Sequence, residues 1–300
     1  MIEPSNYDSN FLGLLLSRGR MIVHFQHGLR RYKADLSRPV SISVRQSFDQ
    51  HQINHFGVDL ASRQPIRLEG FVGSTRLGGS CNVDQISIIP HCNGTHVEHV
   101  GHIVDAIADN PLEKIPPLML ASLISVATPA AAATSEHYRP PLHPEDRVIS
   151  AASLQAEMGA LALAGPATVA ALILRTLPND DAKRQYRYGE QIAPPFLTVD
   201  AMEWILEQGF EHLLVDFPSL DRMHDDGLLT NHHLFWNVAE RTHDLAADSR
   251  SGRSITELVF IPDHIEDGLY VLNLQFPDWA SDAAPARPLL FPLQPDDDRD

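Results

Sequence analysis

The sequence predicts a single domain that mixes helices and strands, of the α/β or α+β class. Short apolar runs of strand length recur along the chain, an amphipathic helix lies between two of them, and hairpin-like patterns occur near both ends. The 300 residues are 43% apolar and 21% charged, a composition typical of a globular protein with a sizeable core.

Strands are predicted wherever a short apolar run is bounded by proline, glycine or charged residues. Such runs occupy residues 83–89, 118–129, 170–175, 213–215 and 288–292. Residues 21–44 form a strand–turn–strand pattern, and residues 255–262 and 269–276 flank Asp267-Gly268, which predicts a second hairpin. The glycine-rich residues 70–80 lack the lysine of a phosphate-binding loop and are interpreted as a turn.

A helix is predicted after Thr198, which is a suitable N-cap and has Asp200 in the turn that follows. Apolar residues then recur at helical spacing until Gly209. The domain is expected to span residues 21–295. Residues 1–20 are interpreted as an N-terminal extension outside the fold, and residues 296–300 as a solvated acidic tail.

Charge and cysteine content restrict the partners and the compartment. Acidic residues outnumber basic ones 39 to 23, and the net charge of -16 argues against nucleic acid as a partner. No apolar run reaches the roughly 20 residues that cross a bilayer, so no membrane association is expected. The two cysteines, Cys81 and Cys92, form no CxxC pair, which favours a cytoplasmic protein without a disulfide framework.

Residues 91–102, HCNGTHVEHVGH, concentrate four histidines, a cysteine and a glutamate. These groups bind metals and transfer protons, and burying them without partners is costly. The segment follows a predicted strand, and Gly94 allows the chain to bend close to an ion. The alternative is a set of surface histidines in a chain that contains 16 of them, and the HExxH pattern of zinc proteases is absent.

Further candidates lie in the second half of the chain. Asp216 and Ser219 follow a buried strand, although a turn with capped backbone groups is the simpler interpretation of these two residues. His232 and His233 precede an apolar Leu-Phe-Trp run. Glu257 lies among apolar and β-branched residues, where a carboxylate needs a partner such as a metal ion.

Taken together, these segments resemble the cyclase family, whose best-known members are bacterial kynurenine formamidases (arylformamidases). The family motif H-x-G-T-H-x-D-x-P-x-H is similar to the run from Cys92 to His102. The family's D-x-x-S-x-D segment and histidine pair resemble residues 216–221 and 232–233, and its glutamate and P-x-R segments resemble Glu257 and residues 285–287. The likeness covers residues 33–292.

The resemblance implies a swivelling β/β/α fold, with a mixed sheet and flanking helices, and a site for one or two Zn²⁺ ions, with Mn²⁺ as a possible substitute. It implies His102 as the acid/base, and Asp216 and Ser219 as support behind the ligands. The implied metal ligands are Cys92, His96, Glu98, His232 and Glu257, with His91 as the alternative to Cys92.

Two departures from the family motif affect this site. Cys92 occupies the position of the family's first histidine, and His91 is one residue out of register. On a strand, adjacent side chains point to opposite faces, so only one of the two is expected to enter the site. A thiolate suits zinc but not manganese. Glu98 replaces a family aspartate and reaches further by one methylene.

The implied activity is hydrolysis of a small amide, an N-formyl aromatic amine or a related cyclic amide, by a metal-activated water. The resemblance also implies a small-molecule substrate and a homodimer or homotetramer. Two alternatives stay open: a non-catalytic member with an absent or structural metal, and a ring-closing or dehydrating enzyme of secondary metabolism.

Overall fold

The computed structural model describes residues 19–27, 30–105, 110–160, 169–189 and 192–296. Nearly all of the expected N-terminal extension therefore lies outside the described residues, as do residues 297–300 of the expected acidic tail. The first tail residue, Asp296, is described. Its carboxylate lies 3.0 Å from His24 Nδ1 and 3.1 Å from an Arg31 guanidinium nitrogen.

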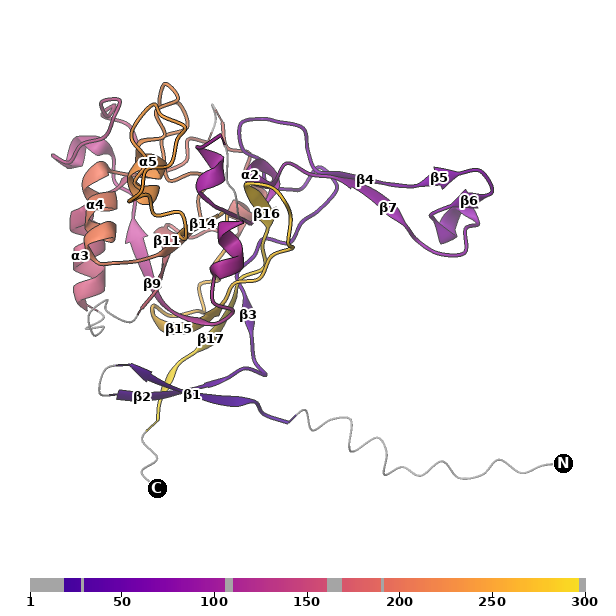
Figure 1. Cartoon of the computed structure of the whole chain (residues 1–300), viewed down its shortest axis with the longest axis horizontal. Coiled ribbons are helices and arrows are strands. Elements are labelled where there is room, and N and C mark those ends of the chain that lie inside the picture. Colours follow the sequence, from indigo (N-terminus) through magenta and orange to yellow (C-terminus); the bar gives the residue numbers. More distant parts are fainter. Residues whose placement is uncertain (1–18, 28–29, 106–109, 161–168, 190–191, 297–300) are drawn as a thin grey trace.

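Within the described residues, a nine-stranded mixed sheet forms the centre of the molecule, in the order β16-β8-β14-β13-β11-β9-β15-β17-β3 (Figure 1). The four central strands β14, β13, β11 and β9 run parallel, and the outer strands pair antiparallel. The strands are β3 (Val40–Ser41), β8 (His96–Glu98), β9 (Met119–Ala127), β11 (Ala171–Leu177), β13 (His212–Val215), β14 (Ser254–Glu257), β15 (Gly268–Asn273), β16 (Ala283–Pro285) and β17 (Leu289–Pro292). The predicted α/β class with a mixed sheet is confirmed.

Helices α3 (Ala151–Ala160), α4 (Val199–Glu207) and α5 (Thr230–Trp236) lie beside the sheet (Figure 1). Met202 and Trp236 belong to the same apolar cluster as Leu172 on β11. Ile173, the next residue on β11, belongs to a second cluster on the opposite face, as the alternation of strand side chains requires. Because both faces are covered, the central strands are almost uniformly apolar.

Several predicted elements are confirmed. The hairpin at residues 21–44 is β1 (Ile22–His27) with β2 (Arg30–Asp35), joined by β18 (Gln294–Pro295). The Thr198 hydroxyl accepts a hydrogen bond from the Ala201 N–H and caps α4, as predicted. Among the described residues, no helix is long and apolar enough to span a bilayer.

The hairpin predicted around Asp267-Gly268 is wrong. Its two strands, β14 and β15, are separated in the sheet by β13, β11 and β9. Asp267 instead accepts hydrogen bonds from the Ser125 N–H and hydroxyl and from Arg175. It therefore fixes the end of a long crossover rather than a tight turn.

A narrow ribbon, residues 62–87, projects from the body of the molecule (Figure 1). It consists of β4 (Ser62–Pro65) paired with β7 (Asp84–Ser87), followed outward by β5 (Arg67–Leu68), β6 (Phe71–Val72) and a 3-10 turn at Thr75–Leu77. We call this segment the arm. Its glycine-rich tip agrees with the predicted turn at residues 70–80.

The remaining elements are short. They are β10 (Val148–Ile149), β12 (Phe196–Leu197), the helical turn α2 (Pro90–Asn93) and the 3-10 turns at Val100–His102, Pro111–Lys114, Ala131–Ala133 and Asp181–Gln185. Pro90 ends the strand predicted for residues 83–89 and opens α2, directly before β8.

Candidate metal centre

Two adjacent strands, β8 and β14, provide the base of the candidate site. His96 and Glu98 lie two residues apart on β8, so both side chains leave the same face of the sheet. Glu257, at the end of β14, pairs with His96 across the strands. His96 Nε2 lies 3.5 Å from Glu257 Oε2. Local strand geometry alone therefore brings these three groups together.

Helix α5 adds His232 to this base. His232 Nε2 lies 3.1 Å from Glu98 Oε1 and 3.8 Å from Glu257 Oε1. On the other side of the ring, Nδ1 contacts Asp221 Oδ2 at 2.5 Å, which fixes the orientation of the imidazole. A histidine held by a carboxylate and presenting its other nitrogen is the usual arrangement of a metal ligand.

The segments before and after β8 complete the cluster with two more imidazoles. His91 Nδ1 lies 3.0 Å from Glu98 Oε2, and His91 Nε2 lies 2.8 Å from Asp282 Oδ2. His102 Nδ1 lies 3.4 Å from the same Asp282 oxygen and 3.9 Å from Glu98 Oε2. Glu98 thus contacts three histidines from three separate elements.

Three overlapping sets of side chains have ligand atoms within 4.8 Å of one another in the described part of the chain. They are His91, His96 and Glu98; Glu98, His102 and His232; and His91, His102 and Asp282. Imidazole and carboxylate are sound ligands for zinc and for other divalent metals.

An unsatisfied atom in this cluster fits a bound cation. His96 Nδ1 lies 3.0 Å from the Gly94 carbonyl, so it carries the proton and Nε2 holds a lone pair. His96 Nε2 is buried and has no hydrogen-bond partner among the described residues. Such a buried acceptor is costly without a partner. A metal ion at the cluster would satisfy this atom, next to the Glu98 carboxylate, whose Oε2 pairs with His91 Nδ1 at 3.0 Å.

The charges of the cluster are strongly coupled. Burial disfavours charge on His91, yet hydrogen bonds to Asp282 and Glu98 raise the pKa of His91 to about 10. Burial also opposes charge on Glu98, but the nearby His102 and His232 lower the pKa of Glu98 well below its usual range. His102 and His91 likewise hold the pKa of Asp282 below its usual range. Hydrogen bonds to carboxylates also raise the pKa of His232 against the effect of burial. Without a metal ion, protons on His91 and His232 balance the carboxylates, and binding a metal would displace them.

Cys92 and His91 are placed differently from each other. They lie on the helical turn α2 rather than on a strand, so their side chains diverge around a helix axis. His91 reaches Glu98, whereas Cys92 belongs to none of the three ligand sets found among the described residues. Burial, together with the charge of Glu257, raises the pKa of the Cys92 thiol to about 11. The structure thus brings His91, not Cys92, into the cluster.

Asp216 and Ser219, predicted to support the ligands, differ in their contacts. Asp216 is fully engaged with Lys183 and Thr176, and these contacts include none of the predicted ligands. The Ser219 hydroxyl accepts a hydrogen bond from the Asp221 N–H, and Asp221 in turn holds His232. Ser219 therefore supports the loop that orients a ligand.

Sequence reasoning missed Asp282 and His55, and gave Asp221 no role. Asp221 ends the D-x-x-S-x-D segment, so a signal was present. Asp282 has none: it immediately precedes β16, and pairing of β16 with β8 brings it to residues nearly 200 positions away in the chain. Only the sheet order reveals it.

His55 is a second unsatisfied imidazole near the centre. It is 2% exposed, and neither ring nitrogen has a partner among the described residues. Burial, followed by the charges of His96 and His224, lowers the pKa of His55 to about 4, so the ring is neutral. The Phe56 ring lies against the His55 ring, with 3.9 Å between the two ring centroids. The backbone of Phe56 has a positive φ of 59°, which bulky residues rarely adopt. His55 is a candidate contact for a ligand.

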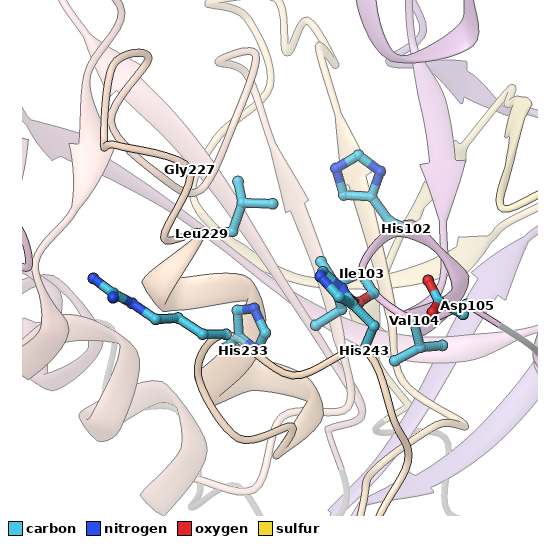
Figure 2. A pocket seen from close by; sticks show the side chains of 9 residues that line it. His102, Ile103, Val104, Asp105, Gly227, Leu229, His233 and His243 are labelled. Atoms are coloured by element: carbon cyan, nitrogen blue, oxygen red, sulfur yellow. Dashed lines mark hydrogen bonds between the residues drawn. The ribbon is translucent and has the colours of Figure 1, made fainter.

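A cavity of about 470 Å³ opens beside His102 (Figure 2). Its wall is both apolar and polar, and includes Ile103, Val104, Leu229, His233 and His243. The volume lies in the range of small-molecule sites. Because His102 belongs to both the cavity wall and the cluster, a molecule in the cavity would lie next to the candidate metal ligands.

The fold and the cluster together define an α/β protein with a potential centre for a divalent metal at the edge of a mixed sheet. The family model described as "Putative cyclase" matches residues 34–222, more than half of the chain. The chain therefore belongs to this cyclase family, as its sequence motifs indicated.

Solved structures share the fold at low sequence identity. A predicted metal-dependent hydrolase from Bacillus stearothermophilus aligns with a TM-score of 0.52 and 14% identity, over 85% of this chain and 98% of the other. A novel cyclase aligns with a TM-score of 0.56 and 12% identity, over 86% and 89%. Isatin hydrolase A from Ralstonia solanacearum aligns with a TM-score of 0.50 and 16% identity, over 97% and 99%. No curated protein matches the sequence.

Proposed function

We propose that this protein is a metal-dependent hydrolase of a small amide, either an N-formyl aromatic amine or a cyclic amide of the isatin type. The unsatisfied His96 Nε2, in a cluster of imidazoles and carboxylates that adjoins a cavity, carries the proposal. Family membership and the likeness to a predicted metal-dependent hydrolase and to isatin hydrolase A support it.

The ligands in this proposal are His96, Glu98, His232 and Glu257, with His91 rather than Cys92 as the remaining one. This donor set of imidazoles and carboxylates suits one or two Zn²⁺ ions, and without a thiolate it also accepts Mn²⁺. When bound, the metal would supply Lewis acidity and lower the pKa of a coordinated water toward about 7.

His102 is the acid/base of the proposed reaction. Its Nδ1 faces Asp282 at 3.4 Å, which leaves Nε2 for proton transfer, and the residue lines the cavity. His102 takes a proton from the attacking water and returns it to the nitrogen that leaves the cleaved amide bond. Asp282 orients the ring and stabilises its charged form, as a carboxylate does for a catalytic histidine.

Leu229 and the aliphatic side chains of Ile103 and Val104 line the cavity next to His102. They offer an apolar surface to a planar ring, while His233, His243, Asp105 and Arg241 offer polar and charged contacts. This combination suits a small aromatic amide that carries polar groups.

Two measurements test the proposal. Elemental analysis of protein purified without chelator should find about one or two divalent metal ions per chain. Isatin, formanilide and N-formylkynurenine are then assayed as substrates, and at least one should be hydrolysed only by the metal-loaded protein. A metal-loaded protein inactive on all three would reject the proposed substrate class, and a protein that binds no metal would reject the whole proposal.

The role of His102 has its own test. His102→Ala should retain its metal and lose turnover by roughly 10²- to 10⁴-fold, the usual contribution of a general acid/base. His264→Ala, at an exposed histidine outside the site, is the matched control and should keep wild-type turnover. Wild-type turnover in fully metallated His102→Ala protein would remove the proton-transfer assignment.

A further inference from the structure

His55 is a buried imidazole that the proposed reaction does not yet use. Its side chain is 2% exposed, and both ring nitrogens lack a hydrogen-bond partner among the described residues. No other side chain in the described part of the chain has two such buried atoms. A neutral imidazole offers one donor and one acceptor, and leaving both without a partner in the interior is costly. A partner from outside the chain is therefore expected.

The loop that carries His55 binds its neighbouring polar side chains internally. The Gln52 side chain accepts a hydrogen bond from the Ala61 N–H at 3.0 Å and donates one to the Ala61 carbonyl at 3.1 Å. Asn54 Nδ2 donates to the Val58 carbonyl at 3.1 Å. These bonds brace the loop, so the imidazole of His55 is held in place while its own polar atoms stay unpaired.

The backbone of this loop is fixed between two segments that carry proposed ligands. The His55 N–H donates to the Cys92 carbonyl at 3.0 Å, one residue after the proposed ligand His91. Ile53 packs in the same apolar cluster as Leu258, which directly follows β14 and the ligand at its end. The loop therefore adjoins the candidate metal centre on two of its elements.

The surroundings of the His55 ring keep it neutral. The Phe56 ring lies 3.9 Å away between centroids, and the Tyr188 ring meets it edge-on at 6.4 Å. Burial, and then the charges of His96 and His224, lower the pKa of His55 to about 4. A neutral imidazole keeps one N–H, which can donate to an oxygen atom of a bound molecule.

We propose that the His55 imidazole donates a hydrogen bond to the carbonyl oxygen of the amide substrate, an inference that rests on the proposed function. When water attacks the carbonyl carbon, negative charge develops on this oxygen, and the carbon–nitrogen bond then breaks. A donor that the fold already holds in place stabilises this charge effectively. His102 transfers the proton from the water to the leaving nitrogen, whereas His55 neither gains nor loses a proton.

The first test needs neither substrate nor metal. His55→Leu and His55→Phe replace the two unpaired nitrogens by apolar atoms, so at least one variant should raise the urea midpoint of chelator-treated protein. His212→Leu is the matched control: His212 is also 2% exposed, but its Nδ1 lies 2.9 Å from the Ser254 hydroxyl, and its loss should lower the midpoint. A lower midpoint in both His55 variants would show that the imidazole supports the fold, and would overturn the proposal.

The second test measures the reaction. On whichever of isatin, formanilide and N-formylkynurenine the wild type hydrolyses, His55→Leu should keep its metal and lose kcat/KM by roughly 10²- to 10³-fold, the usual effect of removing one such donor. His55→Gln retains an N–H donor and should restore at least about tenfold of this loss.

Three outcomes would count against the inference. Wild-type kcat/KM in fully metallated His55→Leu protein would overturn it and leave the proposed function intact. Equal losses in the leucine and glutamine variants would show that the shape of the side chain matters rather than its N–H, and would also overturn it. A metal-loaded wild type inactive on all three amides would instead overturn the proposed substrate class, and the inference with it.

Discussion

The molecule contains two buried polar clusters near the carboxyl ends of its central strands, and only one of them is complete. In the first, Lys183 Nζ contacts Asp216 Oδ2 at 2.9 Å, the Thr176 carbonyl at 2.6 Å and the Thr176 hydroxyl at 2.8 Å. Asp216 also accepts hydrogen bonds from the Thr176 N–H and hydroxyl. In the second, the candidate metal centre, His96 Nε2 has no hydrogen-bond partner among the described residues.

This difference indicates which cluster stabilises the fold and which one binds a ligand. Buried polar groups are costly unless they are paired, and the chain supplies every partner for Lys183 and Asp216 itself. At the metal centre the chain instead assembles several ligand atoms and leaves the acceptor His96 Nε2 without a hydrogen-bond partner among the described residues. The first cluster therefore stabilises the fold, and the second is prepared to bind.

The largest effect is expected at the centre of the second cluster. Glu98→Gln removes the negative charge that contacts His91, His102 and His232. Metal affinity should fall by well over 100-fold, more than the roughly 10- to 100-fold loss caused by residues behind the ligands. Isothermal titration of apo protein with Zn²⁺ measures this. Glu203→Gln, on the exposed face of α4, should bind like wild type, and tight binding by Glu98→Gln would exclude Glu98 as a ligand.

In the first cluster, removal of a charged side chain should lower the stability of the fold and leave metal binding unchanged. Lys183→Met leaves Asp216 buried without its cation, and burial already raises the pKa of Asp216. The free energy of unfolding should fall by about 3–5 kcal/mol, as for other broken buried ion pairs, while metal stoichiometry stays unchanged. Urea unfolding and elemental analysis of the same sample check both. Loss of metal without loss of stability would reverse the roles given to the two clusters.

A buried histidine outside both clusters gives a pH-dependent effect of intermediate size. Burial, and then the charge of Arg253, lowers the pKa of His212 to about 4, and its Nδ1 lies 2.9 Å from the Ser254 hydroxyl. In the unfolded chain His212 takes up a proton near pH 6.5, whereas in the fold it does so only near pH 4. The contribution of neutral His212 to the free energy of unfolding is therefore fully present above pH 6.5 and is lost as pH falls toward 4. The loss amounts to up to about 3 kcal/mol.

His212→Gln should therefore flatten the dependence of unfolding free energy on pH between 6.5 and 4. Urea unfolding of chelator-treated protein is the appropriate measurement, because it removes any contribution of bound metal. His55 has a similarly lowered pKa, so part of the slope should persist in the variant. A slope identical to that of wild type would show that His212 is not buried in its neutral form.

The smallest effect, on metal affinity, is expected for residues that orient a ligand without binding the metal themselves. Asp221→Asn keeps the shape that holds His232 but removes the charge, and metal affinity should fall by roughly 10- to 100-fold. Ser219→Ala, which loses only the contact with the Asp221 N–H, should stay below tenfold and serves as the matched comparison. If Asp221→Asn binds metal like wild type, His232 does not depend on this carboxylate for its orientation.

The sequence by itself determined the α/β class, most strands, the capped helix after Thr198 and the segments that carry chemistry. These features depend on local periodicity, on capping and on a dense motif, all of which are visible within a few residues. His96, Glu98, His232 and Glu257 were expected as ligands from the resemblance to the cyclase family, and the structure brings all four together.

The tertiary structure decided what depends on strand order and on the direction of individual side chains. Sequence spacing favoured neither a pairing of β8 with β16 nor the resulting contacts of Asp282 with His91 and His102. Nor could it choose between His91 and Cys92, because a helical turn aims adjacent side chains about 100° apart whereas a strand aims them to opposite faces. The predicted hairpin failed for the same reason: Asp267 is bound by Ser125 and Arg175, which are distant in the sequence and close only in the fold.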